Sequence, residues 1–138
     1  MVIEDITNAL GVIALQGPQS SALFQTMTDE DLSNDAFAFG TGRWMQAGGV
    51  RLWAQRISYV GELGWEIYIP WADASAFLDA MLKAGKAFDL RPVGMHVVDA
   101  ARQEKGFRHW GHDVVYEDNL VEAGLAFHAD VQQRQLGL

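Results

Sequence analysis

The chain has 138 residues and no cysteine, which excludes disulfides and thiolate metal sites. Its net charge of −8 repels a phosphate backbone, so no nucleic acid is expected as a partner, although one or two sheltered arginines could still bind an anionic ligand. No stretch reaches the ~18 uncharged apolar residues of a membrane span, and the start carries acids where a secretory signal carries bases. We therefore expect one soluble, cytoplasmic domain without membrane association.

The N-terminal third of the chain predicts a strand followed by a helix. An apolar run at 11–17 ends in glycine, which is typical of a short strand. Pro18 follows directly, and proline is tolerated in the first turn of a helix. The acidic stretch 28–35 predicts a loop that ends the helix.

The middle of the chain predicts an antiparallel sheet. Residues 42–70 are rich in aromatic and branched side chains and are interrupted by two glycine pairs, which favours three strands with two tight connections. In the last of these strands, Leu63, Trp65, Ile67 and Ile69 alternate with less apolar residues. This period of two predicts a sheet with one buried face.

Two helices are predicted after the sheet. Apolar residues of 71–85 recur at helical spacing, and Gly85 is placed to end that helix. A second helix is predicted from about 94 to 106, with Val97, Val98 and Ala101 on its apolar side. The order of these elements predicts an α+β fold in the ferredoxin-like style, with helices packed on one face of the sheet. The remainder predicts one short strand, and a disordered tail is expected at 129–138.

Glu62 is the first candidate for a binding residue. It lies in a turn between Gly61 and Gly64, where the backbone can bend sharply and a flat ligand can approach without a Cβ in the way. The alternative is a solvated hairpin turn, because polar residues favour turns for solubility and backbone reasons. The residues alone leave both interpretations open.

Arg102 has a similar pair of interpretations. Asp99 precedes it by one helical turn, so an exposed ion pair on the helix would explain both residues. Alternatively, its aliphatic stem lies along the edge of the core and its guanidinium meets a planar acceptor.

Other chemistry has little support in the sequence. His109, His112 and Asp113 could suggest a metal site, but Gly111 interrupts their helical face and no third ligand follows at a convincing spacing, so we expect no metal and leave the roles of both histidines open. The chain has neither a Gly-x-Ser-x-Gly elbow nor a Walker phosphate loop, and no catalytic residue is assigned.

Three stretches together resemble a known family. "LQGPQSSALFQTMT", "RISYVGELGWEIYIP" and "DAARQEKGFRHWGHDVVYEDNLVEAGLAF" are similar, in order and spacing, to segments of the folate-binding domain of aminomethyltransferases, as in the T-protein of the glycine cleavage system. The forms "SYVGELGWE" and "EKGFRHWGHD" most resemble the C-terminal region of dimethylglycine and sarcosine dehydrogenases. The resemblance covers residues of about 7 to 128 in a single domain spanning 1–138.

The resemblance implies a tetrahydrofolate site that receives a one-carbon unit from an amine donor as methylene-tetrahydrofolate. Family members place a folate-contacting glutamate at Glu62 and a contacting arginine at Arg102. A pterin presents two parallel N–H donors that one carboxylate can accept together, and bonds to an ionised acceptor are short and strong. Tyr59 is then expected to form a wall beside the ring.

The resemblance also implies that parts of the family's site lie outside this sequence. The expected aspartate precedes "LQGP" in the family, and the β-rich barrel that closes the site follows "EAGL". The sequence has no GxGxxG motif, so no FAD is expected on this chain. "NLVEAGL" and Gln103 depart from the family pattern in detail.

Two functions from different classes remain open at this stage. One is the tetrahydrofolate-binding part of a one-carbon transferase, or of a sarcosine or dimethylglycine dehydrogenase-like enzyme, which needs partner segments for catalysis. The other is a non-catalytic remnant or assembly module that retains the fold; a relative of sulfonium demethylases is a third, weaker alternative. In each case we expect an exposed apolar surface that is covered by a homo-oligomer or by a separate chain.

Overall fold

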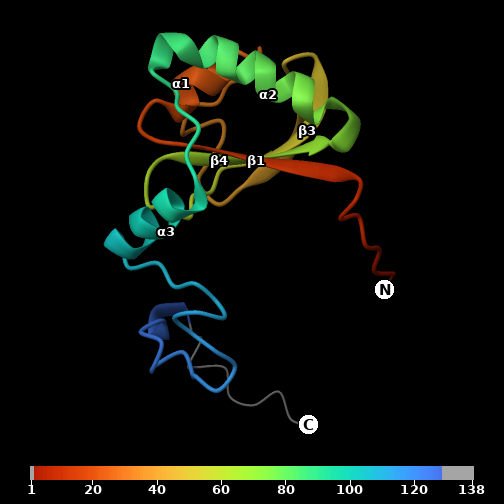
Figure 1. Ribbon diagram of the computed structural model, residues 1–138. Coiled ribbons are helices and arrows are strands. Elements are labelled where there is room, and N and C mark those ends of the chain that lie inside the picture. The colour runs from red at the N-terminus through yellow and green to blue at the C-terminus, as the bar shows by residue number, and fades with distance from the viewer. Residues whose placement is uncertain (1, 129–138) are drawn as a thin grey trace.

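A central antiparallel sheet organises the computed structural model, which describes residues 2–128 (Figure 1). The elements are, in chain order, β1 (Leu10–Gln16), α1 (Ser20–Gln25), β2 (Gly42–Ala47), β3 (Val50–Gln55), β4 (Gly64–Pro70), α2 (Trp71–Gly85), the 3-10 turn η1 (Lys86–Phe88), α3 (Met95–Glu104) and the 3-10 turn η2 (Ala126–His128).

The four strands lie in the order β1-β4-β3-β2, and all neighbours are antiparallel. Strand β1 pairs with β4 along its whole length, from Leu10 opposite Pro70 to Gln16 opposite Gly64. Helices α1 and α2 lie on the same side of this sheet, and α3 lies beyond its other side (Figure 1). The predicted α+β class with an antiparallel sheet is confirmed, and α1 and α2 cover one face as expected; α3, which was expected on that face too, lies away from it.

The core lies between the sheet and helices α1 and α2. Trp65, Ile67 and Ile69 of β4 are fully buried, so the predicted alternation in this strand is confirmed. The rings of Phe24 and Phe37 meet the Trp65 indole edge-on at centroid distances of 5.4 and 4.8 Å. Such aromatic pairs contribute ~0.5–1.5 kcal/mol each beyond the burial of their area. β4 therefore supplies the centre of the core.

One of the two predicted tight connections is present. Gly48 and Gly49 join β2 to β3 with φ of 56° and 80°, the positive values that a two-residue hairpin of this type requires. The connection from β3 to β4 is longer than predicted and occupies residues 56–63. Its shape is set by distant contacts, because the buried Arg56 guanidinium donates to the carbonyl oxygen of Phe37 at 2.6 Å.

The predicted helices form, but their buried faces differ from the expected ones. In α2, Phe77 is buried, whereas Trp71 and Leu78 are exposed. The α3 helix leaves Val97 exposed and buries Arg102 instead. The reason is that Trp71 and Leu78 border an open groove along the edge strand β1, and α3 does not lie on the core face of the sheet.

The C-terminal part of the chain is mostly irregular. Where a short strand was predicted, the described residues contain only an isolated bridge between Trp110 and Val114. The predicted disordered tail, 129–138, lies outside the described residues. Within residues 2–128, no helix is both long enough and apolar enough to cross a membrane.

The position of β4 leads to a prediction for stability. Replacing Ile67 by alanine removes a fully buried side chain and should lower the free energy of unfolding by ~2–5 kcal/mol. The matched change Val93→Ala removes methyl groups from an exposed residue and should alter the free energy of unfolding by less than ~0.5 kcal/mol. Urea unfolding followed by circular dichroism measures both, and equal losses would contradict the assigned core.

Candidate functional site

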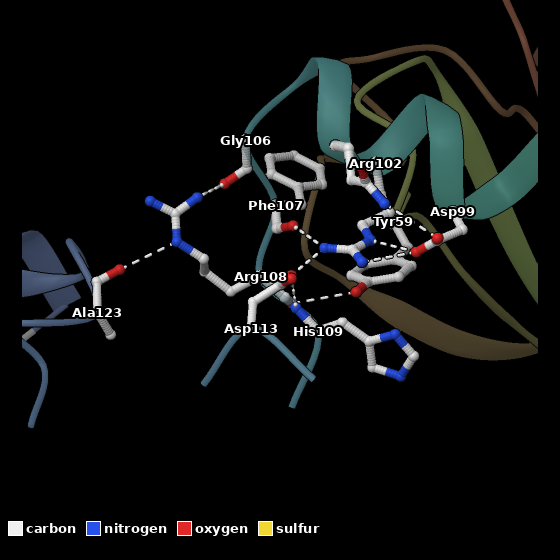
Figure 2. A network of polar contacts seen from close by, with 10 residues as sticks. Tyr59, Asp99, Arg102, Gly106, Phe107, Arg108, His109, Asp113 and Ala123 are labelled. Atoms are coloured by element: carbon white, nitrogen blue, oxygen red, sulfur yellow. Dashed lines mark hydrogen bonds and ion pairs between the residues drawn. The ribbon is translucent and has the colours of Figure 1, made fainter. Parts of the chain in front are cut away.

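A buried arginine on α3 is the centre of the candidate site. The Arg102 side chain is only 5% exposed, and Figure 2 shows its guanidinium between two carboxylates. Its Nε donates to Asp99 Oδ1 at 2.8 Å, and a second guanidinium nitrogen lies 2.6 Å from the same oxygen. A third nitrogen donates to Asp113 Oδ2 and to the carbonyl oxygen of Phe107, the latter at 3.2 Å. The charge is therefore paired on two sides.

The end of α3 brings these partners around Arg102. Gly106 follows the helix with a φ of 73°, a left-handed conformation that glycine adopts without strain. Its N–H donates to Gln103 O and the N–H of Phe107 donates to Arg102 O, both at 2.9 Å. These two bonds form a Schellman motif, which ends the helix and turns the chain back. Phe107 and the segment after it therefore return over the arginine.

Asp113 joins the returning segment to the helix. Besides the guanidinium of Arg102, its Oδ2 accepts the backbone N–H of His109 at 2.9 Å. That backbone bond is the main reason why the pKa of Asp113 lies below its ordinary value, and Arg102 lowers it further. The pKa of Asp99 is also lowered, chiefly by its hydrogen bond from Arg102. Both carboxylates are thus held in the ionised form.

A cavity of about 210 Å³ lies beside this network. It is lined mainly by apolar and aromatic side chains, with one carboxylate in its wall: Tyr59, Met95, His96, Val98, Asp99, His109 and His112. Asp99 is thus shared between the cavity and the ion-pair network. A second, polar cavity of about 430 Å³ borders Arg102 and Asp113.

Tyr59 connects the loop between β3 and β4 with the segment after α3. Its hydroxyl donates to the carbonyl oxygen of Arg108 at 3.0 Å (Figure 2). Its ring stacks on Phe107 at 6.4 Å and meets His109 edge-on at 6.2 Å between centroids. The aromatic face of Tyr59 therefore forms part of the wall of the smaller cavity, although its neighbours already contact it.

Glu62 lies in the same loop and meets the end of α3. Its Oε1 is 3.4 Å from Nζ of Lys105, and the two side chains are 48% and 45% exposed. Gly61 has a φ of 71°, and a Cβ there would lie within 2.2 Å of the Lys105 side chain. Only glycine fits this close approach, so the turn that carries Glu62 is held directly against the helix.

The structure therefore brings the three predicted residues to one end of α3 but gives them different partners. Tyr59 lines the cavity, Glu62 is paired with Lys105, and the guanidinium of Arg102 is paired with Asp99 and Asp113. The ion pair between Asp99 and Arg102 that the helical spacing indicated is present, but the arginine in it is buried rather than exposed.

The sequence analysis did not predict the roles of two charged residues at this site, Lys105 and Asp113. Lys105 follows Arg102 by three residues, and this helical spacing was the available signal that both face the same loop. Asp113 entered the sequence analysis only as a metal candidate; its distance along the chain from Arg102 gave no signal of contact. Residues 2–128 contain no group of three or more potential metal ligands, and the rings of His109 and His112 lie 4.3 Å apart.

The two lowered carboxylate pKa values predict acid sensitivity of the segment after α3. Their folded pKa values lie below the ordinary value of 3.8, so their stabilising contribution is complete above about pH 4 and is lost as the pH falls through the folded values. The protection factor of the His109 amide, whose N–H donates to Asp113, should fall in this range.

The variant Asp113→Asn should give fast exchange at the His109 amide already at neutral pH, whereas Asp73→Asn on α2 should leave it unchanged. A protection factor in the unmodified chain that stays constant from pH 7 to about pH 1, where both carboxylates are protonated, would contradict the assigned role of these carboxylates.

Comparison with known proteins places these features in a family. The model of the GCVT N-terminal domain matches residues 1–133. The chain is 44% identical over 123 residues to human mitochondrial sarcosine dehydrogenase, and these residues are 89% of this chain and 13% of that protein. It is 40% identical over 125 residues to human mitochondrial dimethylglycine dehydrogenase, and these residues are 91% of this chain and 14% of that protein. An aminomethyltransferase of Caldanaerobacter subterraneus subsp. tengcongensis is 34% identical over 125 residues, which are 91% of this chain and 33% of that protein. The chain belongs to the GCVT N-terminal domain family.

Proposed function

We propose that this chain is the tetrahydrofolate-binding part of a one-carbon transferase or of a sarcosine or dimethylglycine dehydrogenase-like protein. The observation that carries the proposal is the cavity beside α3, which has the Tyr59 ring in its wall. Glu62 does not line this cavity, but it lies in the same loop as Tyr59 and is paired with Lys105 at the end of the same helix. The family and the names of the relatives support the chemical class of the ligand.

Glu62 fits the role of the ligand's hydrogen-bond acceptor. Its carboxylate is half exposed, so a ligand can reach it from solvent. A pterin offers a ring N–H and an adjacent amino group as two parallel donors, and an ionised carboxylate accepts both more strongly than a neutral group would. The ion pair with Lys105 opposes ligand binding only weakly, because an exposed ion pair contributes only ~0.2–1 kcal/mol of stability.

The size and lining of the cavity favour a flat ring system. At about 210 Å³ it is smaller than the ~300–1,000 Å³ of sites that enclose a drug-sized molecule. A ring could lie against Tyr59 while the rest of the ligand extends into solvent or toward another segment. Aromatic side chains suit this role because a ring stacks on them with little loss of conformational freedom.

Arg102 acts mainly through its neighbours in this proposal. Its guanidinium is buried and engaged by two carboxylates, so its main effect is to fix Asp99 in the cavity wall and the 107–113 segment above it. Its positive charge also lies close enough to this wall to favour a ligand oxygen there. We therefore expect Arg102 to be a positioning residue more than a direct donor.

Catalysis by this chain alone is not part of the proposal. The chain spans between 13% and 33% of the length of the relatives compared above. When bound, tetrahydrofolate supplies the acceptor for the one-carbon unit, and transfer requires an amine donor and a proton-handling group held beside it. In this proposal, segments outside residues 2–128, a homo-oligomer or a separate chain supply these groups.

A non-catalytic assembly module is the second candidate. It is favoured by the pairing of every charged group at the site, since Arg102 and Glu62 already have partners without a ligand. The two candidates differ in a direct binding measurement. A chain that folds but gives no heat with tetrahydrofolate would be an assembly module.

Calorimetry with tetrahydrofolate tests the role of Glu62. Glu62→Gln keeps the shape of the side chain but removes its charge, and should weaken binding ~10- to 100-fold because bonds to an ionised acceptor are the stronger ones. Lys105→Met keeps the apolar stem against Gly61 and frees the carboxylate, so it should tighten binding by at most ~5-fold.

The control for this measurement is Glu4→Gln, which removes an exposed carboxylate outside the site and should leave the affinity unchanged. Equal affinity of Glu62→Gln and the unmodified chain would remove Glu62 from the site.

Substitutions of Tyr59 separate its ring from its hydroxyl. Tyr59→Ala removes the wall of the cavity and should weaken binding ~5- to 100-fold, the range found when an aromatic stacking partner is truncated. Tyr59→Phe removes only the bond to Arg108 O, and its affinity should stay within ~3-fold. The same calorimetric titration measures both, and a loss as large for phenylalanine as for alanine would assign Tyr59 a structural role only.

A further inference from the structure

Among residues 2–128, Asp99 is the one carboxylate in the wall of the smaller cavity beside α3. The other polar side chains that line this cavity are those of Tyr59, His96, His109 and His112. A hydroxyl or an imidazole can donate a hydrogen bond as well as accept one, whereas an ionised carboxylate can only accept. Asp99 can therefore distinguish a ligand edge that carries an N–H from an edge that carries only a lone pair.

The Asp99 carboxylate is held in a fixed position and still faces solvent. Its Oδ1 accepts from the Arg102 guanidinium, and its Oδ2 accepts from Nε2 of Gln103 at 2.9 Å (Figure 2). The bond from Arg102 is the main reason why the pKa of Asp99 is lowered, so this carboxyl group stays ionised at neutral pH. The side chain is nevertheless 47% exposed, and each carboxylate oxygen can accept a further hydrogen bond. A ligand in the cavity thus meets an acceptor that does not have to move.

Asp99 and Glu62 approach the cavity region from different positions along α3. Asp99 lines the cavity together with Tyr59, whereas Glu62 is paired with Lys105 at the end of the helix. Lys105 follows Asp99 by six residues, which is a helical rise of about 9 Å. This length is comparable with a bicyclic ring that has a hydrogen bond at each of two edges. The two carboxylates can therefore contact different edges of one ring.

The oxidation state of a pterin changes the hydrogen-bonding character of only one part of its ring system. In tetrahydrofolate N8 carries a hydrogen, whereas in folic acid N8 has a lone pair and no hydrogen. N5 changes in the same way, but it is bonded to the one-carbon unit in methylene-tetrahydrofolate, so N8–H is the donor that remains in both substrate and product. The ring N–H and amino group assigned to Glu62 are present in the oxidised and the reduced form alike. A carboxylate beside N8 therefore attracts the reduced ring and repels the oxidised one.

We propose that Asp99 is a specificity-determining residue that selects the tetrahydro form of the ring by accepting a hydrogen bond from N8–H. This inference rests on the proposed function, since it concerns the same cavity and the same ligand. The buried Arg102 contributes by holding the acceptor, so that the carboxylate cannot turn away from the lone pair of an oxidised ring. The unmodified chain should bind tetrahydrofolate at least ~10-fold more tightly than folic acid, because only the reduced ring satisfies the fixed acceptor.

Calorimetry with tetrahydrofolate and with folic acid, both under nitrogen, tests the proposal. The quantity to compare is the ratio of the two dissociation constants, because a structural defect of the site weakens the binding of both ligands and leaves their ratio unchanged. Asp99→Asn introduces an amide that can donate to N8 of the oxidised ring as well as accept from N8–H of the reduced ring. The preference for tetrahydrofolate should therefore fall by ~10-fold in this variant.

Asp113→Asn is the matched control for the ion-pair network. It also removes a carboxylate paired with Arg102, but Asp113 does not line the smaller cavity, so the ratio should stay within ~3-fold of that of the unmodified chain. Glu62→Gln should weaken the binding of both ligands and likewise keep the ratio within ~3-fold, because the ring edge assigned to Glu62 is the same in both.

A second measurement requires no variant and remains decisive if Asp99→Asn fails to fold. The ¹³C resonance of the Asp99 carboxyl carbon, extrapolated to saturation, should shift more with tetrahydrofolate than with folic acid. Equal affinity of the unmodified chain for the two ligands would overturn the inference, and so would equal shifts or a ratio that Asp99→Asn leaves unchanged. These outcomes leave tetrahydrofolate binding itself intact. A folded chain that binds neither ligand would instead contradict the proposed function, and the inference would be lost with it.

Discussion

The pleat of β4 is the constraint on which the rest of the structure depends. Its alternating side chains bury Trp65, Ile67 and Ile69 against α1 and α2 and place Glu66 and Tyr68 on the opposite face. Because β4 lies between β1 and β3, it joins the first strand to the hairpin formed much later in the chain. The loop that enters β4 carries Tyr59 and Glu62. One strand therefore determines the core and the approach to the cavity, and a shift of its register by one residue would exchange its buried and opposite faces.

The buried arginine of α3 has a comparable role outside the sheet. Burying a guanidinium is costly unless its hydrogen bonds are satisfied, and here two carboxylates and a backbone carbonyl satisfy them. The Schellman turn at Gly106 makes this possible, because it returns the chain over the helix. The same pairing fixes Asp99 in the wall of the cavity. Order in the C-terminal segment thus depends on electrostatic pairing, whereas order in the sheet depends on apolar burial.

The two proposals concern two carboxylates that are held in different ways. Glu62 is paired with a half-exposed lysine, whereas Asp99 is paired with a buried arginine. A ligand can replace the first pairing at little cost in free energy, while the second pairing keeps Asp99 in place when a ligand binds. Affinity and selectivity can therefore be measured and altered separately. The net charge of −8 opposes the approach of an anionic folate at long range, so contacts at short range matter more.

The sequence by itself determined the elements, the class and the family, because period-two and helical spacing, glycine turns and local motifs are properties of neighbouring residues. It indicated the β4 alternation, the 71–85 helix, the Gly48-Gly49 hairpin and the pairing of Arg102 with Asp99. Only the tertiary structure decided that β1 pairs with β4, that residues 56–63 form a long loop, and that Glu62 meets Lys105. It also decided that Arg102 is buried between Asp99 and Asp113. Each of these contacts joins segments whose meeting depends on how the whole chain packs, and no local pattern encodes which distant partner a side chain will find.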